Sequence, residues 1–124
     1  MAAKPRRKLP LVVYIAGPYR AANSWDVEQN IRRAETLALA VWRAGFAALC
    51  PHTNTRFYDG AAPDYVWLTG DLALLQNCDA LLTVDGWERS TGTQDEIAFA
   101  RDEQHMPVFH RIEDLIAWRD TTHG

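Results

Sequence analysis

Short apolar runs alternate with stretches of helical periodicity along this chain, and that alternation constrains the fold most. The run Leu11 to Ala16 is rich in β-branched residues and ends at Gly17, which is typical of a strand buried on both faces. From Ser24 to Ala44 apolar residues recur at helical spacing, with Ser24 as the expected N-cap and Gly45 as the stop. The chain is therefore predicted to start with a strand and a long helix.

The rest of the chain continues the alternation. Further strands are predicted over 46–50, 80–84 and 107–110, and further helices over 64–77, 93–104 and 112–118, with a polar loop over 52–63. This order predicts a doubly wound, flavodoxin-like (Rossmann-like) α/β fold, with a parallel sheet of four to five strands and helices on both faces. At 124 residues we expect one domain, 11–120, after a basic N-terminal tail, 1–10.

Composition limits the classes of partner. The 48% hydrophobic and 23% charged residues are typical of a globular protein, and the net charge of -3 does not favour binding to a polymeric nucleic acid. The apolar run 11–16 is too short for a signal peptide or a membrane span, so we expect a cytoplasmic protein. Cys50 and Cys78 lack zinc-ligand spacing and are interpreted as reduced core residues. Neither a metal ion nor a cofactor is implied.

Loops after the strands are the places to look for a site, because doubly wound folds bind ligands at the carboxyl ends of their strands. In the first of these loops Gly17 allows a sharp turn and close approach to a ligand, and Arg20 can meet an anion. The loop lacks the glycines of a dinucleotide-binding motif or a P-loop. Ser90 and Gly92 precede a predicted helix, whose N-terminus would favour an anion such as a 5′-phosphate.

Two carboxylates, Asp71 and Glu96, admit more than one interpretation, and a third, Asp79, is expected to be structural. Asp71 has apolar neighbours at helical spacing, which indicates a raised pKa, although it also fits a solvated helix aspartate. Glu96 is either a catalytic group or half of a capping box that starts at Thr93. Asp79 precedes a strand at the opposite edge of the sheet, where structural hydrogen bonds are expected.

Three ring side chains lie near the same expected edge. Tyr14 points either into the core or into the cleft. His52 follows the second predicted strand on the correct edge, but no serine or cysteine nucleophile pattern accompanies it, which favours a loop histidine. Trp87 could line the pocket and stack on a base, whereas the other tryptophans fit the core or a subunit interface.

Several fragments together resemble the nucleoside 2-deoxyribosyltransferase superfamily. The resemblance spans Val12 to Phe109 and is carried by the following stretches: Tyr14-Ile-Ala-Gly-Pro18, Asn30, Asp71 through Asp79, Gly86-Trp-Glu-Arg-Ser-Thr-Gly92, Glu96 and Ala100. It is closest to the small phage and bacterial branch related to 2′-deoxynucleoside 5′-phosphate N-hydrolases. The resemblance also implies a homodimer or larger homo-oligomer.

The resemblance assigns roles to these positions. It implies that Glu96 is the nucleophile at C1′, that Asp71 assists the leaving base or positions the sugar, and that Tyr14 orients Glu96. The positions of Ser90 and Arg20 contact the 5′-phosphate in the hydrolase branch, whereas transferases that take unphosphorylated nucleosides have an aspartate in place of Ser90. The expected substrate-binding residues are Gly17, Tyr19, Arg20, His52, Trp87, Ser90 and Gly92.

The expected activity is cleavage of the N-glycosidic bond of a (deoxy)nucleoside 5′-monophosphate, giving free base and sugar phosphate. Breaking this bond develops positive charge on the sugar and negative charge on the base, so two groups with opposite tasks are needed, as in glycosidases. Glu96 would stabilise or trap the sugar, and Asp71 would assist the base. The alternatives are a nucleoside deoxyribosyltransferase and a non-catalytic protein that binds or senses nucleotides.

Overall fold

Four parallel strands form the central sheet in the computed structural model, which describes residues 9–123. The strands are β1 (Val12–Ala16), β2 (Ala47–Leu49), β3 (Ala80–Thr83) and β4 (Val108–Phe109). Their spatial order is β2-β1-β3-β4, and every neighbouring pair is parallel. The order confirms the predicted doubly wound, flavodoxin-like sheet. The basic residues between Lys4 and Lys8 lie outside the described residues.

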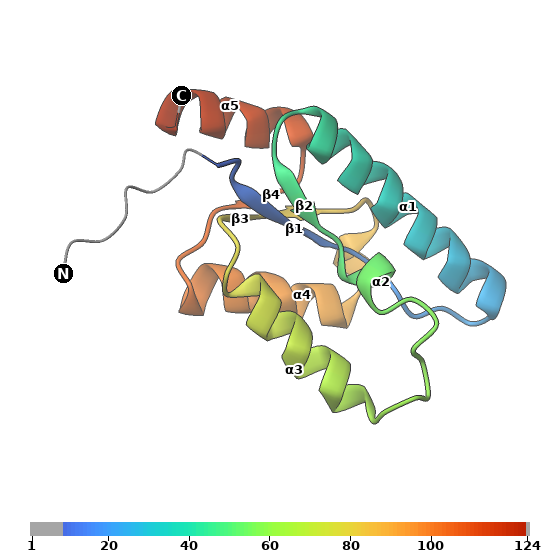
Figure 1. Cartoon of the computed structure of the whole chain (residues 1–124). Coiled ribbons are helices and arrows are strands. Elements are labelled where there is room, and N and C mark those ends of the chain that lie inside the picture. The colour runs from blue at the N-terminus through green and yellow to red at the C-terminus, as the bar shows by residue number, and fades with distance from the viewer. Residues whose placement is uncertain (1–8, 124) are drawn as a thin grey trace.

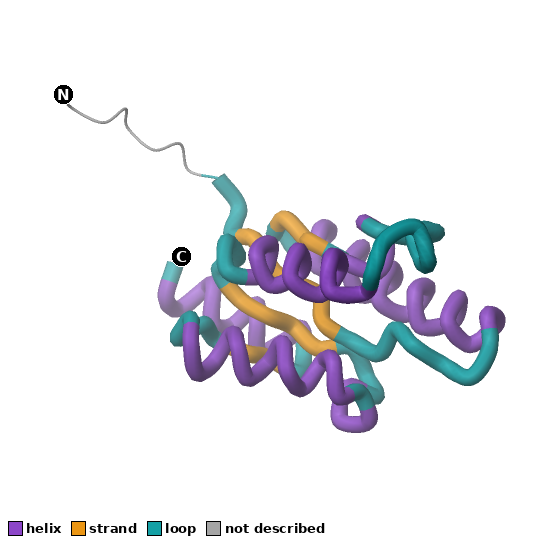
Figure 2. The backbone as a smooth tube through the Cα atoms, turned by 90° about the horizontal axis from the view of Figure 1, so that it is seen from below, coloured by secondary structure: helices purple, strands orange, loops and turns teal. Residues whose placement is uncertain are grey.

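Helices cover both faces of the sheet, with α1 and α5 on one side and α3 and α4 on the other (Figures 1 and 2). The helices are α1 (Ser24–Arg43), α2 (Pro51–Asn54), α3 (Asp64–Leu75), α4 (Thr91–Ala98) and α5 (Ile112–Thr122). A 3₁₀ turn, Trp87–Arg89, precedes α4, and a π-helical stretch, Phe99–Glu103, continues it. Among residues 9–123 no helix has the length and apolar character that crossing a membrane requires.

The two faces of β1 bury different side chains. Successive residues of a strand point to opposite faces, so Val13 and Ile15 pack toward α1 and α5, while Tyr14 and Ala16 pack toward α3 and α4. All four side chains are buried, as the continuous apolar run predicted. The register of β1 therefore turns Tyr14 toward the helix that carries Glu96.

Helix α1 begins one residue away from its predicted cap. Asn23, and not Ser24, is the N-cap, because its side-chain Oδ1 accepts a hydrogen bond from the Asp26 N–H at 2.8 Å. The prediction of Ser24 as the cap was wrong, and Ser24 is the first helical residue. Gly45 does follow the end of the helix, where its φ of 98° suits glycine better than any other residue.

The segment after β2 is not entirely a loop. Pro51 starts the short helix α2, because its fixed φ suits the first helical position. The prediction of a polar loop from residue 52 was therefore wrong for its first residues, and His52 is a buried helical residue that is 7% exposed.

Three smaller predictions concern cysteines and an aspartate. Cys50 is buried in the main core, as predicted, while Cys78 is half-buried beside the second core cluster, and both are free thiols. Asp79 accepts a hydrogen bond from the Val12 N–H at 2.8 Å. This bond fixes the entry to β1 and confirms that Asp79 has a structural partner.

Close packing at the carboxyl ends of β1 and β3 depends on Gly17. A Cβ atom at this position would lie 2.6 Å from the Cβ of Val84, so any side chain would push the two strand ends apart. Beyond this point the chain leaves β1 toward α1 and leaves β3 toward α4, on opposite faces of the sheet. A crevice opens between the diverging connections, as it does at the switch point of other doubly wound folds.

Candidate active site

A pocket of about 750 Å³ occupies this crevice. Its wall comes from the loop after β1, from one face of α1, from α2, from α3, and from α4 with the segment that leads into it. It brings together eight of the predicted site residues: Gly17, Tyr19, Arg20, His52, Asp71, Ser90, Gly92 and Glu96. We call it the active-site pocket.

Glu96 is held from the side of the sheet. The hydroxyl of Tyr14 donates a hydrogen bond to Oε2 of Glu96, while the Tyr14 ring is fully buried in the core. Burial, together with the nearby Glu96, raises the pKa of Tyr14 well above its ordinary value, so the hydroxyl stays protonated and remains a donor. Tyr14 thus satisfies both interpretations of its position, because its ring belongs to the core and its hydroxyl reaches the site.

The environment of Glu96 disfavours its charged form. The pKa of Glu96 is raised to about 7, chiefly by burial and also by the negative charges of Asp71 and Asp95, while the hydrogen bond from Tyr14 acts in the opposite direction. A carboxyl group with a pKa near neutrality changes charge at the pH at which most enzymes work. Glu96 can therefore serve as a nucleophile once it is ionised.

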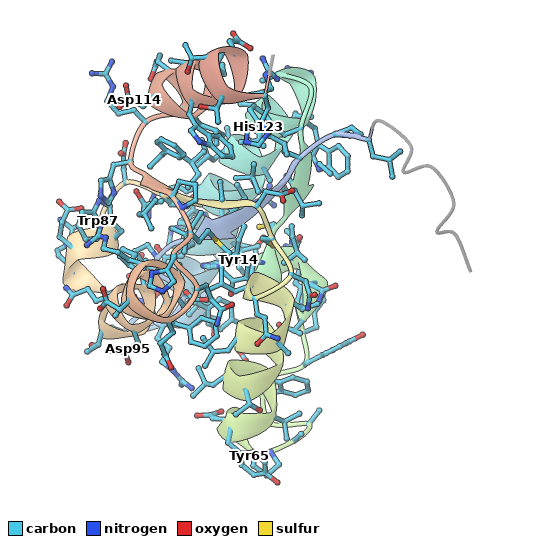
Figure 3. The ribbon with its side chains drawn as sticks, turned by 90° about the vertical axis from the view of Figure 1, so that its left-hand side faces the viewer. Tyr14, Tyr65, Trp87, Asp95, Asp114 and His123 are labelled. Atoms are coloured by element: carbon cyan, nitrogen blue, oxygen red, sulfur yellow. The ribbon has the colours of Figure 1, made fainter. Side chains whose placement is uncertain are left out.

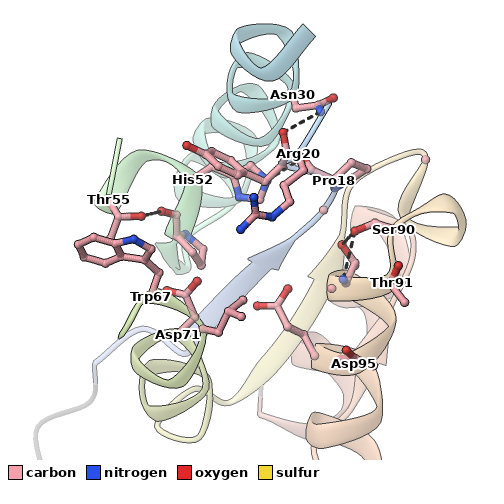
Figure 4. Close-up of a pocket in the computed structure, with 18 of the residues that line it drawn as sticks. Pro18, Arg20, Asn30, His52, Thr55, Trp67, Asp71, Ser90, Thr91 and Asp95 are labelled. Carbon is pink, nitrogen blue, oxygen red and sulfur yellow. Dashed lines mark hydrogen bonds between the residues drawn. The ribbon is translucent and has the colours of Figure 1, made fainter. Parts of the chain in front are cut away.

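Asp71 faces the same pocket from α3. Burial raises its pKa to about 6, so the interpretation as a fully solvated helix aspartate does not fit its half-buried position. Figure 4 shows Asp71 on α3 and Ser90 at the start of α4, on opposite sides of the pocket. The negative charge of Asp71 is one of the causes that raise the pKa of Glu96, so the ionisation of Glu96 depends on that of Asp71.

Ser90 caps α4, and this excludes the capping box predicted from Thr93. The Ser90 Oγ accepts two hydrogen bonds from Thr93, from its N–H at 3.2 Å and from its hydroxyl at 2.9 Å (Figure 4). Thr93 is therefore a donor inside the first turn, and Glu96 takes no part in the cap. Since both acceptor sites of Ser90 are used, its own hydroxyl hydrogen is left to donate to a ligand.

Two contacts tie the loop after β1 to the first residue of α3 and to the segment before it. Arg20 forms an ion pair with Asp64 at 2.5 Å, and both side chains are mostly exposed, at 73% and 62%. The hydroxyl of Tyr19 donates a hydrogen bond to Asp59 at 2.8 Å. In this arrangement Arg20 lines the pocket with its charge already neutralised by Asp64.

His52 contacts the backbone of the same loop, after β1. Its Nε2 lies 2.8 Å from the carbonyl oxygen of Pro18, which can only accept, so Nε2 carries the hydrogen. Burial lowers the pKa of His52, which keeps the ring neutral, and the ring packs edge-on against Tyr19 with 5.4 Å between centroids. His52 lines the pocket, but its Nε2 is used to hold the backbone of the loop.

Sequence reasoning missed two arginines that line the pocket. Arg33 donates a hydrogen bond to the Oδ1 of Asn30 at 2.8 Å, and Arg89 lies in the segment before α4. Neither forms an ion pair within residues 9–123, in contrast to Arg20. Helical spacing places Arg33 one turn after Asn30, but only the fold shows that this face of α1 reaches the pocket.

The prediction that Trp87 lines the pocket was wrong. Its ring stacks on His110, with 4.4 Å between centroids and 10° between planes, and it is not part of the pocket wall. Figure 3 shows Tyr14 near the centre of the molecule and Trp87 toward its edge. The 3₁₀ turn that starts at Trp87 carries the indole away from the crevice.

Carboxylates are abundant around the pocket but dispersed. They come from three parts of the chain and are Asp59, Asp64, Asp71, Asp85, Asp95 and Glu96. Within the part of the chain that the structure describes, no three His, Cys, Asp or Glu side chains are grouped closely enough to hold a metal ion.

Comparison with known proteins identifies a family without naming an activity. Residues 11–111 match the family model described as a domain of unknown function (DUF7768). No curated protein matches the chain. The resemblance to nucleoside 2-deoxyribosyltransferases therefore stays a prediction. Because the match covers most of its length, the chain belongs to the DUF7768 family.

Proposed function

We propose that this member of the DUF7768 family cleaves the N-glycosidic bond of a (deoxy)nucleoside 5′-monophosphate. The observation that carries the proposal is the hydrogen bond from Tyr14 to Glu96 in a pocket that Asp71 also lines. With the pKa of Glu96 at about 7 and that of Asp71 at about 6, both groups change charge near neutral pH, and the fraction of molecules with Glu96 ionised and Asp71 protonated has a nucleophile and an acid. The predicted roles of Glu96, Asp71 and Tyr14 agree with this geometry.

The first step transfers the sugar to the enzyme. An ionised oxygen of Glu96 attacks C1′ and forms a C1′–O bond as the C1′–N bond breaks. The bonding electron pair leaves on the base nitrogen, and the base takes the proton of the Asp71 carboxyl group. Tyr14 positions Glu96 through its hydroxyl and keeps its proton throughout.

The second step releases the sugar phosphate. A water oxygen attacks C1′, the Asp71 carboxylate takes one proton from that water, and the C1′–O bond to Glu96 breaks. Glu96 returns as a carboxylate and Asp71 as a carboxylic acid, so the cycle is closed. If a second base attacked in place of water, the same intermediate would give a transferase.

A phosphate is the anion that best suits the part of the pocket lined by Ser90, Arg33 and Arg89. The hydroxyl of Ser90 and the N-terminus of α4 offer donors, while Arg33 and Arg89 offer guanidinium groups that carry no ion pair within residues 9–123. Arg20 joins them once a ligand displaces Asp64. A 5′-monophosphate fits this set better than an unphosphorylated nucleoside, which has no anion to place there.

A second copy of the chain is proposed as the partner. Large apolar side chains are exposed on α3 and the segment before it: Phe57, Tyr58, Tyr65, Val66 and Leu68. Such a cluster is typical of an interface between protein chains. Light scattering should give the mass of a dimer or larger oligomer for the unaltered chain, and a lower mass for Tyr65→Asp. A monomeric mass for the unaltered chain at high concentration would contradict this partner.

The activity is tested by direct detection of free base. The protein is incubated with a panel of nucleosides and their 5′-monophosphates, and released base is separated by chromatography. We expect base from at least one monophosphate, and none above background from Glu96→Gln. Glu103→Gln is the matched control, because Glu103 is an exposed glutamate on the continuation of α4 and lies outside the pocket wall.

The same assay separates the alternatives. Adding a second free base and looking for a new nucleoside monophosphate distinguishes a transferase from a hydrolase. Tight binding of a monophosphate with no base release from any substrate would instead support the non-catalytic nucleotide-binding protein. Equal base release from Glu96→Gln and from the unaltered chain would sink the proposal.

A further inference from the structure

A second pocket lies at the same edge of the sheet, on the face covered by α1 and α5. Its volume is about 550 Å³, and its wall comes from α1, from the ends of β3 and β4, and from the start of α5. Two of its wall residues, Arg33 and Asp85, also line the active-site pocket. The other wall residues of the second pocket are absent from the active-site pocket, and the proposed reaction uses none of them.

Positive groups surround this second pocket. Its wall includes Arg32, Arg33 and Arg111. The two negative side chains in the wall are Asp85 and Glu113. One ion pair lies within the wall, between Arg111 and Glu113 at 3.5 Å. Arg32 forms its ion pair at 3.3 Å with Glu28, which is not a wall residue. Arg33 forms no ion pair within residues 9–123, so its charge is open to an anionic ligand.

Two hydrogen-bonding groups are fixed in the same wall. Thr83 is only 3% exposed, and its hydroxyl lies 2.8 Å from Nδ1 of His110. The His110 ring also stacks on Trp87, so its orientation is held from two sides. This leaves the Nε2 atom of an exposed, oriented imidazole without a hydrogen-bond partner within residues 9–123.

The start of α5 adds backbone donors. Arg111 is its N-cap and supplies no side-chain hydrogen bond to the first turn. The N–H groups of Asp114 and Leu115 both bond to the Arg111 carbonyl, while Ile112 and Glu113 line the pocket in the uncapped first turn. An uncapped helix start favours negative charge, in addition to the arginines already in the wall.

Apolar side chains complete the wall. Leu37 comes from α1 and Ile112 from α5, and both side chains are half-buried. An inorganic ion would leave this part of the pocket unfilled, whereas an organic ligand would bury apolar surface against it.

We propose that the second pocket binds a small organic oxyanion, a phosphate or a carboxylate attached to an apolar group. The oxyanion contacts Arg33, Arg111 and the start of α5, and the apolar group packs on the half-buried side chains of Leu37 and Ile112. This site does not depend on the proposed N-glycosidic activity. Because Arg33 and Asp85 line both pockets, a ligand here also contacts two residues of the active-site pocket.

The test uses phenyl phosphate as the probe and ¹⁵N-labelled full-length protein. We expect saturable NMR shifts of the backbone amides of Thr83, Ile112 and Glu113. Benzoate separates a carboxylate from a phosphate as the anionic group, and benzyl alcohol, which has no charge, should bind neither pocket measurably. Binding in the active-site pocket is recognised separately, from shifts of the Gly92 and Thr93 amides.

Arg111→Gln should raise the dissociation constant read from the Ile112 amide about tenfold or more, because it removes one charge-assisted hydrogen bond. Arg111 is 70% exposed, so this change leaves the core intact. Arg101→Gln, an exposed arginine outside both pockets, is the matched control. Arg89→Gln should weaken only the shifts of the active-site pocket.

Two results would overturn the proposal. One is the absence of shifts at Thr83, Ile112 and Glu113 with both anions at tens of millimolar. The other is an unchanged dissociation constant at these amides in Arg111→Gln. A well-dispersed spectrum of each variant shows that it is folded, and Arg32→Gln provides a second variant with the same expected direction.

Discussion

The two ends of the active-site pocket differ in their exposure to solvent. The carboxyl end, made of Tyr14, Asp71 and Glu96, is withdrawn from water, and burial shifts the pKa of all three groups. The arginine end, made of Arg20, Arg33 and Arg89, is exposed to solvent. Burial thus brings the pKa values of the two carboxyl groups close to neutrality, whereas the exposed arginine side chains can change conformation when a ligand binds. Changes at the carboxyl end should alter rate, and changes at the arginine end should alter affinity.

After Glu96→Gln, which should abolish base release, the largest effect is expected from Asp71→Asn. Removing the acid should lower kcat for base release by about 10² to 10⁴, with little change in KM. The loss should be smaller for substrates whose base is a better leaving group, because such a base needs less proton transfer. Steady-state kinetics with two bases of different acidity measure this difference. An equal loss for both bases would contradict the role of Asp71 as the acid.

Tyr14→Phe should have the next largest effect. A hydrogen bond to a charged group is worth roughly 10- to 100-fold, so kcat/KM should fall by about that factor. The unaltered chain should give a bell-shaped profile of kcat/KM against pH, with its optimum between 6 and 7, because one carboxyl must be ionised and the other protonated.

Tyr14→Phe also tests the direction in which the pH optimum shifts. The hydrogen bond from Tyr14 lowers the pKa of Glu96, so its removal should raise that pKa and move the pH optimum upward. A purely structural role for Tyr14 would lower activity at every pH and leave the optimum in place. An optimum that moves downward would contradict the assigned hydrogen bond.

At the arginine end, Arg89→Gln should raise KM for a monophosphate about tenfold and leave kcat nearly unchanged. The physical reason is the loss of a guanidinium that binds the phosphate in both the ground state and the transition state. KM for the corresponding nucleoside should not change. If kcat falls and KM stays constant, Arg89 acts in the chemical step like the carboxyl end, which would contradict the proposed division between affinity and rate.

The smallest effect is expected from Asp64→Asn, and it has the opposite sign. This change releases Arg20 from an exposed ion pair, which is worth at most about 1 kcal/mol, so KM for the monophosphate should fall by up to roughly fivefold. Increasing the salt concentration should reduce the difference from the unaltered chain. An increase in KM would show that Asp64 itself contacts the substrate.

The fold could be predicted from the sequence because each strand lies in a short apolar run and the long helix α1 keeps its periodicity. The predicted elements lie close to the observed ones. The misplaced details are local: Asn23 takes the cap predicted for Ser24, and Pro51 starts a helix instead of ending a strand. Both depend on hydrogen bonds and backbone angles that the apolar pattern does not encode.

The residues of the candidate site were harder to predict from their spacing in the sequence. On its own, the pattern from Thr93 to Glu96 fitted a capping box, and only the resemblance favoured a catalytic Glu96. The fold adds the physical reason, because β1 turns Tyr14 toward α4 while Ser90 supplies the cap. Arg33 looked like any exposed helix arginine, since no local pattern tells which turn of α1 reaches the pocket.

The most direct measurement is a search for the sugar attached to Glu96. The protein is incubated with a 5′-monophosphate that carries fluorine at C2′, which slows attack by water on the intermediate, and is then digested and analysed by mass spectrometry. The predicted result is one equivalent of released base and a sugar phosphate adduct on the peptide that contains Glu96, with neither in Glu96→Gln. Base release with no adduct, or an adduct on another residue, would contradict the assignment of Glu96 as the nucleophile.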